Sequence, residues 1–225
     1  MLSCALRAQN LPQGLTEIVI GEGTEATCEV PFNSCTGWHS YTETIIPAES
    51  IGSSSIIYSL SIDIAEIPQL WNGSYYEPTS FYCDAFYIFL GTSNQSIHNS
   101  SIDWTEEEMT MVYQRFGQYY DWQNGWMTFE FDHPFYYEDN NLVIGFYFMG
   151  YYFYNDVITL KVKCSRSEGS TLKATGVGWI ADSSIEGELF DLFPNIKLGV
   201  VNTPTLVAIP EEVNLGCRPN GYWME

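Results

Sequence analysis

The chain has 225 residues, of which 45% are hydrophobic and 16% aromatic, and this is enough apolar material for a packed core. Its 28 Asp and Glu residues and 8 Lys and Arg residues give a formal charge of −20. A surface of that sign repels a phosphate backbone, so we expect no nucleic-acid binding. No stretch of the sequence reaches the roughly 18 to 20 uninterrupted apolar residues of a membrane helix, and we expect no membrane span.

The acidic charge is unevenly placed along the chain. Residues 8–114 contain 14 Asp and Glu residues but no Lys or Arg. Such a segment favours solubility in a secreted protein, and clustered carboxylates that capture a structural Ca²⁺ ion are the alternative. We expect no other cofactor.

The first twelve residues resemble the end of an export signal. Met1–Ala8 is mostly apolar and ends in a small residue suited to peptidase cleavage, and polar residues follow it. We therefore expect residues 1–12 to be a signal remnant or a disordered tail of a secreted or bacterial cell-surface protein. An acylated Cys4 has less support, because no basic and apolar segment precedes it.

A period of two dominates the rest of the chain and predicts strands. Turn-forming residues separate several of them, most clearly at Asn72-Gly73, Asn124-Gly125 and Asp139–Asn141. Only Pro47–Ile51 and Asp103–Glu108 look helical, each for about one turn. Many strands without helical crossovers predict an all-β antiparallel sandwich or barrel. The predicted strands are Thr16–Ile20, His39–Ile46, Ile56–Ile64, Phe81–Leu90, Met109–Phe116, Trp126–Phe131, Leu142–Phe148, Val157–Cys164 and Asn195–Val200.

Two of these strands differ in the faces that they are predicted to bury. In Ile56–Ile64 the even positions are apolar and the odd ones turn polar after Ile57, which predicts one buried face. Phe81–Leu90 has bulky side chains on both faces, which is typical of a central strand between two layers.

The sequence has 6 cysteines, and removal of Cys4 with a signal would leave an odd number. No two have C-x-x-C spacing and the 3 histidines are scattered, so no metal site is predicted. Cys28 and Cys35 enclose a short loop that a disulfide could close after export, and two free thiols fit the sequence equally well. The disulfide connectivity therefore stays open.

Catalytic motifs are missing from the sequence. There is no G-x-S-x-G, H-E-x-x-H or P-loop pattern, and Gly21–Ala26 is followed by Pro31 rather than by the helix of a dinucleotide site. A glycosidase needs only two carboxylates from anywhere in the chain. The acidic Glu106–Glu108 is most simply a solvated turn, and Asp132-His133 is most simply the start of a loop. We predict no catalytic residue.

Aromatic residues in loops are the stronger candidates for a binding site. They lie beside Asn and Asp, as in sugar platforms, because a pyranose offers an apolar face and a rim of hydroxyls. The alternative is that these rings pack over the ends of the sandwich and that Trp126 begins a strand in the core. The candidate ligand-binding residues are Trp71, Tyr75, Tyr76, Tyr119, Tyr120 and Trp122.

Eight segments between Thr16 and Val200 follow one another in a characteristic order. They are Thr16–Thr24, Val30–Phe32, Tyr41–Gly52, Ser55–Asp63, Ala85–Gly91, Trp126–Tyr137, Asn141–Ile144 and Ile196–Gly199. In this order the chain resembles a module of secreted and surface proteins of Bacteroidetes. The resemblance implies a jelly-roll β-sandwich that occurs beside fibronectin-like or Ig-like domains in adhesin-type proteins. The family has no established catalytic residues, so the resemblance transfers none. The cysteines and the aromatic Phe146–Tyr154 depart from its usual pattern.

The composition changes after Val201, which suggests a domain boundary. We expect residues 13–203 to form the sandwich module and residues 204–225 to be the truncated first strand of a following Ig-like domain, because one strand cannot bury a core. We expect this tail either to remain unpaired or to form an additional strand at an edge of the sandwich.

Two functional classes follow from these observations. The favoured one is a noncatalytic extracellular module of a multidomain bacterial protein that serves adhesion or spacing, with glycan binding as a further role. Its expected partners are glycans, host or cell-surface proteins and neighbouring domains of the same chain. The alternative is a carbohydrate-active enzyme, a glycoside hydrolase, whose carboxylates come together only in the fold.

Overall fold

The computed structural model describes residues 12, 14–35, 39–105, 109–150, 157–175 and 185–202, and these residues form an antiparallel all-β structure. The 3-10 turn η1 (Ala48–Ser50) lies where the sequence predicts a helical turn. Asp103–Thr105 is irregular instead, and residues 106–108 lie outside the described part. The strands are β1 (Thr16–Ile20), β2 (Glu25–Thr27), β3 (His39–Ile46), β4 (Ser55–Glu66), β5 (Gln69–Trp71), β6 (Tyr76–Pro78), β7 (Phe81–Ser93), β8 (Thr110–Tyr120), β9 (Gly125–Tyr137), β10 (Asn141–Gly150), β11 (Val157–Ile158), β12 (Lys161–Thr175), β13 (Glu188–Pro194) and β14 (Ile196–Asn202).

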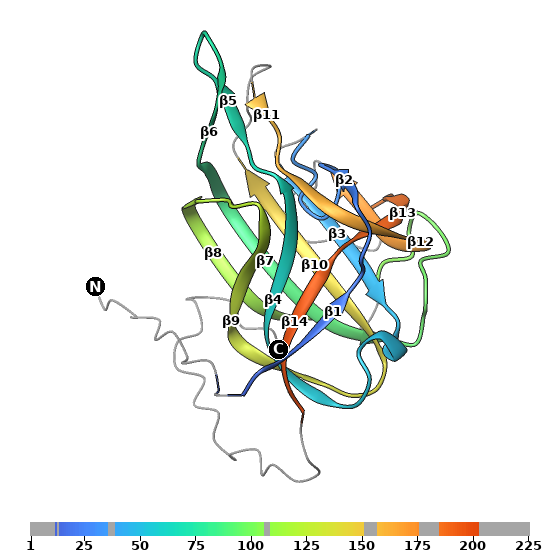
Figure 1. Cartoon of the computed structure of the whole chain (residues 1–225). Coiled ribbons are helices and arrows are strands. Elements are labelled where there is room, and N and C mark those ends of the chain that lie inside the picture. The colour runs from blue at the N-terminus through green and yellow to red at the C-terminus, as the bar shows by residue number, and fades with distance from the viewer. Residues whose placement is uncertain are drawn as a thin grey trace, which may run out of the picture.

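Eight of these strands form the two layers of a jelly roll (Figure 1). One layer has the order β1-β14-β4-β9 and the other the order β3-β10-β7-β8, with antiparallel pairing throughout. Counted along the chain, these are strands 1-8-3-6 and 2-7-4-5, the arrangement that two Greek keys produce. The predicted all-β, jelly-roll-like sandwich is confirmed.

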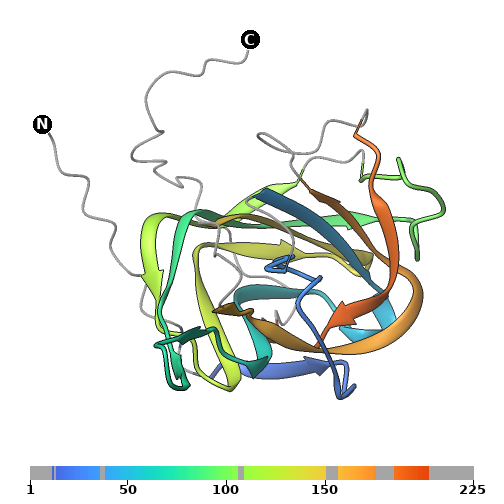
Figure 2. The ribbon, with the colours of Figure 1, turned by 90° about the horizontal axis from the view of Figure 1, so that it is seen from above.

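The long strand β12 joins the two layers along one side. Its first residues pair with β2 and β4, and its later residues pair with β3 and β13. The register with β13 shifts between Arg166 and Thr171, where Gly169 has a φ of 58°. Such a bulge bends the strand, so β12 can serve both layers. Seen from above, the strands curl around a common interior (Figure 2).

Aromatic rings fill the middle of the interior. The ring of Phe32 lies 5.5 Å from those of Phe86, Trp122 and Phe148, and 6.1 Å from that of Phe146, with interplanar angles of 57–75°. Edge-to-face pairs at this spacing contribute about 0.5–1.5 kcal/mol each beyond the burial of their area. A loop residue therefore occupies the centre of the core between the two layers.

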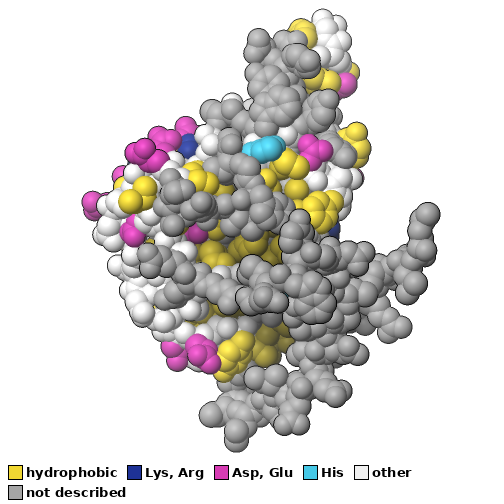
Figure 3. All heavy atoms as spheres, turned by 180° about the vertical axis from the view of Figure 1, so that it is seen from behind, with side chains coloured by type: hydrophobic (Ala, Val, Ile, Leu, Met, Phe, Trp, Pro, Cys, Tyr) yellow, Lys and Arg dark blue, Asp and Glu magenta, His cyan; other side chains and the backbone are white. Residues whose placement is uncertain are grey.

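A second cluster lies on the outer face of the layer that contains β3, β7 and β10. Its buried members are Tyr41, Ala85, Tyr87, Phe89, Trp104, Tyr147, Leu172 and Ala174. Seen from behind, hydrophobic side chains gather near the middle of this face, with acidic ones around them (Figure 3). Since Phe86, Ile88 and Leu90 point into the interior, β7 buries both faces, and the prediction of a central strand is confirmed. The side chains of Phe81 and Tyr82 lie outside the described part.

The predicted alternation of β4 is wrong in its first half. Ile57 rather than Ile56 is fully buried, and Tyr58 is only partly buried, whereas Leu60 and Ile62 face the core as predicted. The pairing of β4 with β9 shifts register between Ile57 and Ser59, so the side chains change faces there.

The glycine-rich segment after β1 has a structural role. A Cβ on Gly23 would overlap the backbone carbonyl of Cys164, and the Gly23 carbonyl accepts a hydrogen bond from Asn195 Nδ2 at 2.7 Å. Gly21 has a φ of 86°, a value that favours glycine. These glycines let the chain cross β12 closely, and the short strand β2 follows them.

The predicted ends of the module lie almost wholly outside the described residues. Of the proposed signal remnant only Pro12 is described, and the tail at 204–225 is not. The described residues contain no helix that is long and apolar enough to cross a membrane.

Candidate functional site: an aromatic end of the sandwich

Five exposed aromatic rings lie at the end of the sandwich where β4 and β8 finish and β7 and β9 begin. We call this region the aromatic end and define it by Trp71, Tyr75, Tyr76, Tyr119 and Trp126. Their exposed fractions are 41%, 61%, 45%, 64% and 39%, in that order. Contiguous exposed apolar side chains are uncommon on soluble proteins, so this concentration makes the region a candidate contact surface.

Strand pairing explains why separate segments meet here. Tyr119 on β8 lies opposite Tyr82 at the start of β7, and Trp126 on β9 lies opposite Asp63 near the end of β4. The hairpin of β5 and β6 follows β4 after two residues and projects beyond the sandwich (Figure 1). The aromatic end thus combines a projecting hairpin with the β8–β9 turn.

Trp71, Tyr75 and Tyr76, which the sequence suggests lie in a loop, belong to the stretch Gln69–Pro78, and this stretch forms the hairpin. The predicted turn at Asn72-Gly73 is confirmed, because Asn72 Oδ1 accepts hydrogen bonds from the backbone N–H groups of Ser74 and Tyr75 at 3.0 and 3.1 Å. β11 pairs with the other edge of β5. The hairpin is therefore held in a small three-stranded sheet.

Two rings on one face of the hairpin form a pair. Trp71 lies opposite Tyr76 across the strands, with 5.1 Å between ring centroids and an interplanar angle of 57°. Leu70 and Glu77 occupy the other face. The paired rings offer an apolar surface bordered by the polar turn.

The β8–β9 turn divides its aromatic residues between core and surface. Tyr120 and Trp122 are buried, with ring centroids 5.5 Å apart, and the Tyr120 hydroxyl lies 3.1 Å from that of Tyr113. Burial and this contact raise the pKa of Tyr120. Four of the six candidate ligand-binding residues are exposed, and Tyr120 and Trp122 close the core beneath them.

Trp126 is the exposed ring that the sequence suggests could belong to the core. It does begin a strand, but its side chain is on the outer face of the sandwich. Lys197 Nζ lies 4.9 Å from its ring centroid and is also paired with Glu17 at 3.1 Å. The signal that could have identified it is the alternation with Phe129 and Phe131, which puts Trp126 out of phase with those core residues.

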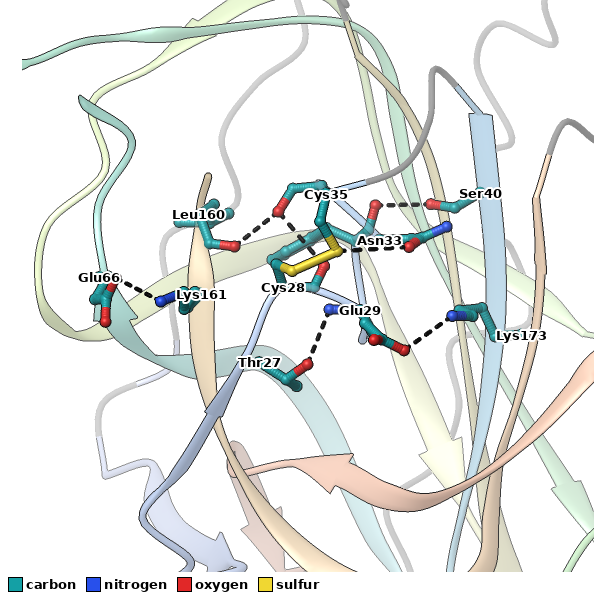
Figure 4. Close-up of a disulfide and its surroundings, with 12 residues drawn as sticks. Thr27, Cys28, Glu29, Asn33, Cys35, Ser40, Glu66, Leu160, Lys161 and Lys173 are labelled. Carbon is teal, nitrogen blue, oxygen red and sulfur yellow. Dashed lines mark hydrogen bonds and ion pairs between the residues drawn. A yellow bond between two sulfur atoms is a disulfide. The ribbon is translucent and has the colours of Figure 1, made fainter. Parts of the chain in front are cut away.

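A disulfide-closed loop, drawn in Figure 4, contacts residues next to both halves of the aromatic end. The structure joins Cys28 to Cys35, with 5.5 Å between their Cα atoms, and so decides between the two alternatives that the sequence leaves open. The loop carries Phe32 against Trp122 of the β8–β9 turn. Ser34 Oγ donates a hydrogen bond to the Leu160 carbonyl at 2.7 Å, next to β11 and the hairpin sheet. One loop therefore supports both segments.

Cys83 and Cys164 are free and buried. Burial raises the pKa of each thiol to about 12, so both remain protonated and unreactive at neutral pH. Cys4 and Cys217 lie outside the described residues.

Among the described residues, the most deeply buried carboxylate belongs to Glu43 on β3. Its Oε1 accepts a hydrogen bond from the Tyr41 hydroxyl at 2.8 Å and its Oε2 accepts one from the backbone N–H of Thr105 at 2.9 Å. Burial raises the pKa of Glu43 despite these hydrogen bonds and the nearby imidazole of His98. In the described part of the chain, no second carboxylate is hydrogen-bonded to this group.

Two other acidic residues, Asp132 and Asp63, form ion pairs. Asp132 accepts two hydrogen bonds from Arg115 Nη1, both at 2.8 Å, and one from the backbone N–H of Gln114 at 2.9 Å. Its neighbour His133 is exposed. The buried Asp63 pairs with Lys163 at 3.0 Å. Glu106–Glu108 lies outside the described residues.

No group of three or more His, Cys, Asp or Glu side chains that could hold a metal ion occurs in the described ranges. The structural Ca²⁺ ion considered from the acidic composition stays a prediction.

Comparison of the chain with protein-family models, with curated proteins and with solved structures gives no match.

Proposed function

We propose that the chain is a noncatalytic β-sandwich module of a secreted or bacterial cell-surface protein, and that it contacts glycans through the aromatic end. The observation that carries the proposal is the concentration of five exposed rings on a projecting hairpin and an adjacent turn. Adhesion or spacing within a multidomain protein is the role that fits such a module, and the resemblance to Bacteroidetes surface proteins supports it.

The chemistry of the aromatic end suits a sugar. Trp71 and Tyr76 supply rings that can stack on the apolar face of a pyranose, and exposed Asn72 and Asn124 supply amides for its hydroxyls. The Cys28–Cys35 disulfide favours an oxidising compartment.

The glycoside hydrolase alternative has less support. Glycosidases act through two carboxylates that flank the substrate. The two buried carboxylates of the described residues, Glu43 and Asp63, are instead bonded to Tyr41 and to Lys163. We therefore make no second proposal.

A glycan array probed with the full chain tests the proposal. We expect binding to at least one glycan class, and a loss of about tenfold or more in the double variant Trp71→Ala/Tyr76→Ala, since a stacked ring contributes on the order of 1–2 kcal/mol. Tyr136→Ala is the matched control, because Tyr136 is 50% exposed and lies near the other end of β9. The proposal would be refuted if the full chain bound no glycan on the array, or if the double variant and Tyr136→Ala lost the same amount of glycan affinity.

A further inference from the structure

Every Lys and Arg among the described residues is already paired with a carboxylate. The N–O distances lie between 2.7 and 3.4 Å. The pairs are Arg115–Asp132, Lys161–Glu66, Lys163–Asp63, Arg166–Glu25, Lys173–Glu29, Lys173–Glu188 and Lys197–Glu17. An anionic ligand would have to compete with these carboxylates for a cation in this part of the chain, against a net charge of −20.

The rings of this protein attract cations where a cation is within reach. Arg115 lies 4.2 Å from the ring centroid of Tyr113, Lys173 lies 4.2 Å from that of Phe190, and Lys197 caps Trp126. Among the described residues, no Lys or Arg lies over Trp71, Tyr75 or Tyr76. These exposed rings are open to a cation from a ligand.

Both segments of the aromatic end also carry a carboxylate without a cationic partner in the described part of the chain. Glu77 is on the hairpin, where its Oε2 accepts a hydrogen bond from Asn72 Nδ2 at 3.2 Å, and Asp121 is in the β8–β9 turn. Both residues are exposed, so both carboxylates are accessible to a ligand.

We propose that the aromatic end selects glycans with protonated amino groups, that is, polymers of deacetylated amino sugars. This inference rests on the proposed function and specifies the charge class of its ligand. The apolar face of one sugar stacks on Trp71 and Tyr76. The ammonium groups of other sugars in the polymer are attracted by Glu77 on the opposite face of the hairpin, by Asp121 in the adjacent turn and by the negative field of the chain. Acidic polysaccharides are repelled, and neutral ones gain only the stacking contribution.

Titration of the full chain with chitosan oligomers and with fully N-acetylated chitin oligomers of equal length tests this inference. The two ligands share a backbone and differ in the charged amine, and mildly acidic buffer keeps the amines protonated. We expect chitosan to bind about tenfold more tightly at low ionic strength. The preference should shrink in about 1 M salt, where the screening length falls to about 3 Å. Polygalacturonate, a polyanion, should not bind.

Charge-removing variants locate the effect. Glu77→Gln and Asp121→Asn should each weaken chitosan binding by about 1.5- to 5-fold, which corresponds to roughly 0.2–1 kcal/mol for an exposed charge pair, and leave chitin binding unchanged. Glu138→Gln is the control, because Glu138 is exposed just beyond β9, at the other end of that strand. If Glu138→Gln weakens chitosan binding as much as the two test variants do, the placement at the aromatic end is wrong.

Two kinds of failure are distinguishable. If chitin binds as tightly as chitosan, or polygalacturonate binds, the charge preference is overturned and glycan binding itself survives. If no glycan binds the full chain, the proposed function fails and this inference fails with it.

Discussion

The rings around Phe32 and the rings of the aromatic end show two uses of the same residue types. Phe32 and Trp122 are almost completely buried between the layers, and each contacts several other rings. Trp71, by contrast, is 41% exposed, and its one ring partner among the described residues is Tyr76. The first group stabilises the sandwich, and the second contributes little to its stability, so the two groups can be separated by mutation.

The largest expected effect comes from truncating a buried ring. Trp122→Ala should lower the free energy of unfolding by about 3–5 kcal/mol, because it removes a large side chain from the core and leaves a cavity. Trp71→Ala should change it by no more than about 0.5 kcal/mol, as is usual for exposed positions. Urea denaturation of both variants measures the difference, and similar losses in the two would contradict the division between core and surface.

A smaller loss is expected when the disulfide-closed loop is opened. The double variant Cys28→Ser/Cys35→Ser should lose about 2–3 kcal/mol, since the disulfide closes a loop of about eight residues in the unfolded chain. Because Phe32 and Ser34 link this loop to Trp122 and to Leu160, amide hydrogen exchange should rise in the β8–β9 turn and around Leu160. Faster exchange that is confined to residues 28–35 would show that the loop supports neither segment.

The third effect depends on pH and concerns Glu43. Burial raises the pKa of Glu43 in the folded state above its ordinary value of 4.5, so its contribution to stability is fully present below that pH and is lost as the pH rises through the folded-state pKa. The stability of the wild type should therefore fall relative to Glu43→Gln as the pH rises from about 4.5. Denaturation curves over a pH series give the comparison. A difference between the wild type and Glu43→Gln that is independent of pH would argue against this account.

Alternation of side chains made much of the fold predictable. Thr16–Ile20 and His39–Ile46 have the predicted bounds, and the other predicted strands are present in longer, shifted or divided form. The polar run in the middle of β12 hides its continuation to Thr175, because Gly169 and the bulge around it interrupt the alternation. Strand β13 was not predicted, and it forms by pairing with β12, which is a contact between distant segments.

The candidate site was predictable only in part. Tyr119 and Tyr120 are adjacent and share the same local sequence, yet Tyr119 is exposed and Tyr120 is buried. Alternation along the strand and the contact with Tyr113 place the side chain of Tyr120 in the core. Trp122 is buried because Phe32, which lies 90 residues earlier in the chain, occupies the core beneath the turn. Such contacts are set by the tertiary fold, and local sequence does not encode them.

Hydroxyl-radical footprinting of the full chain, with and without the glycan it binds best, tests the central claim most directly. Buried Trp104 and Trp122 serve as internal references, because their oxidation should be low in both states. We predict that oxidation of Trp71, Tyr76 and Tyr119 falls when the glycan is added, while that of exposed Tyr136 is unchanged. Protection of Tyr136, without protection of the aromatic end, would contradict the assignment of the binding surface.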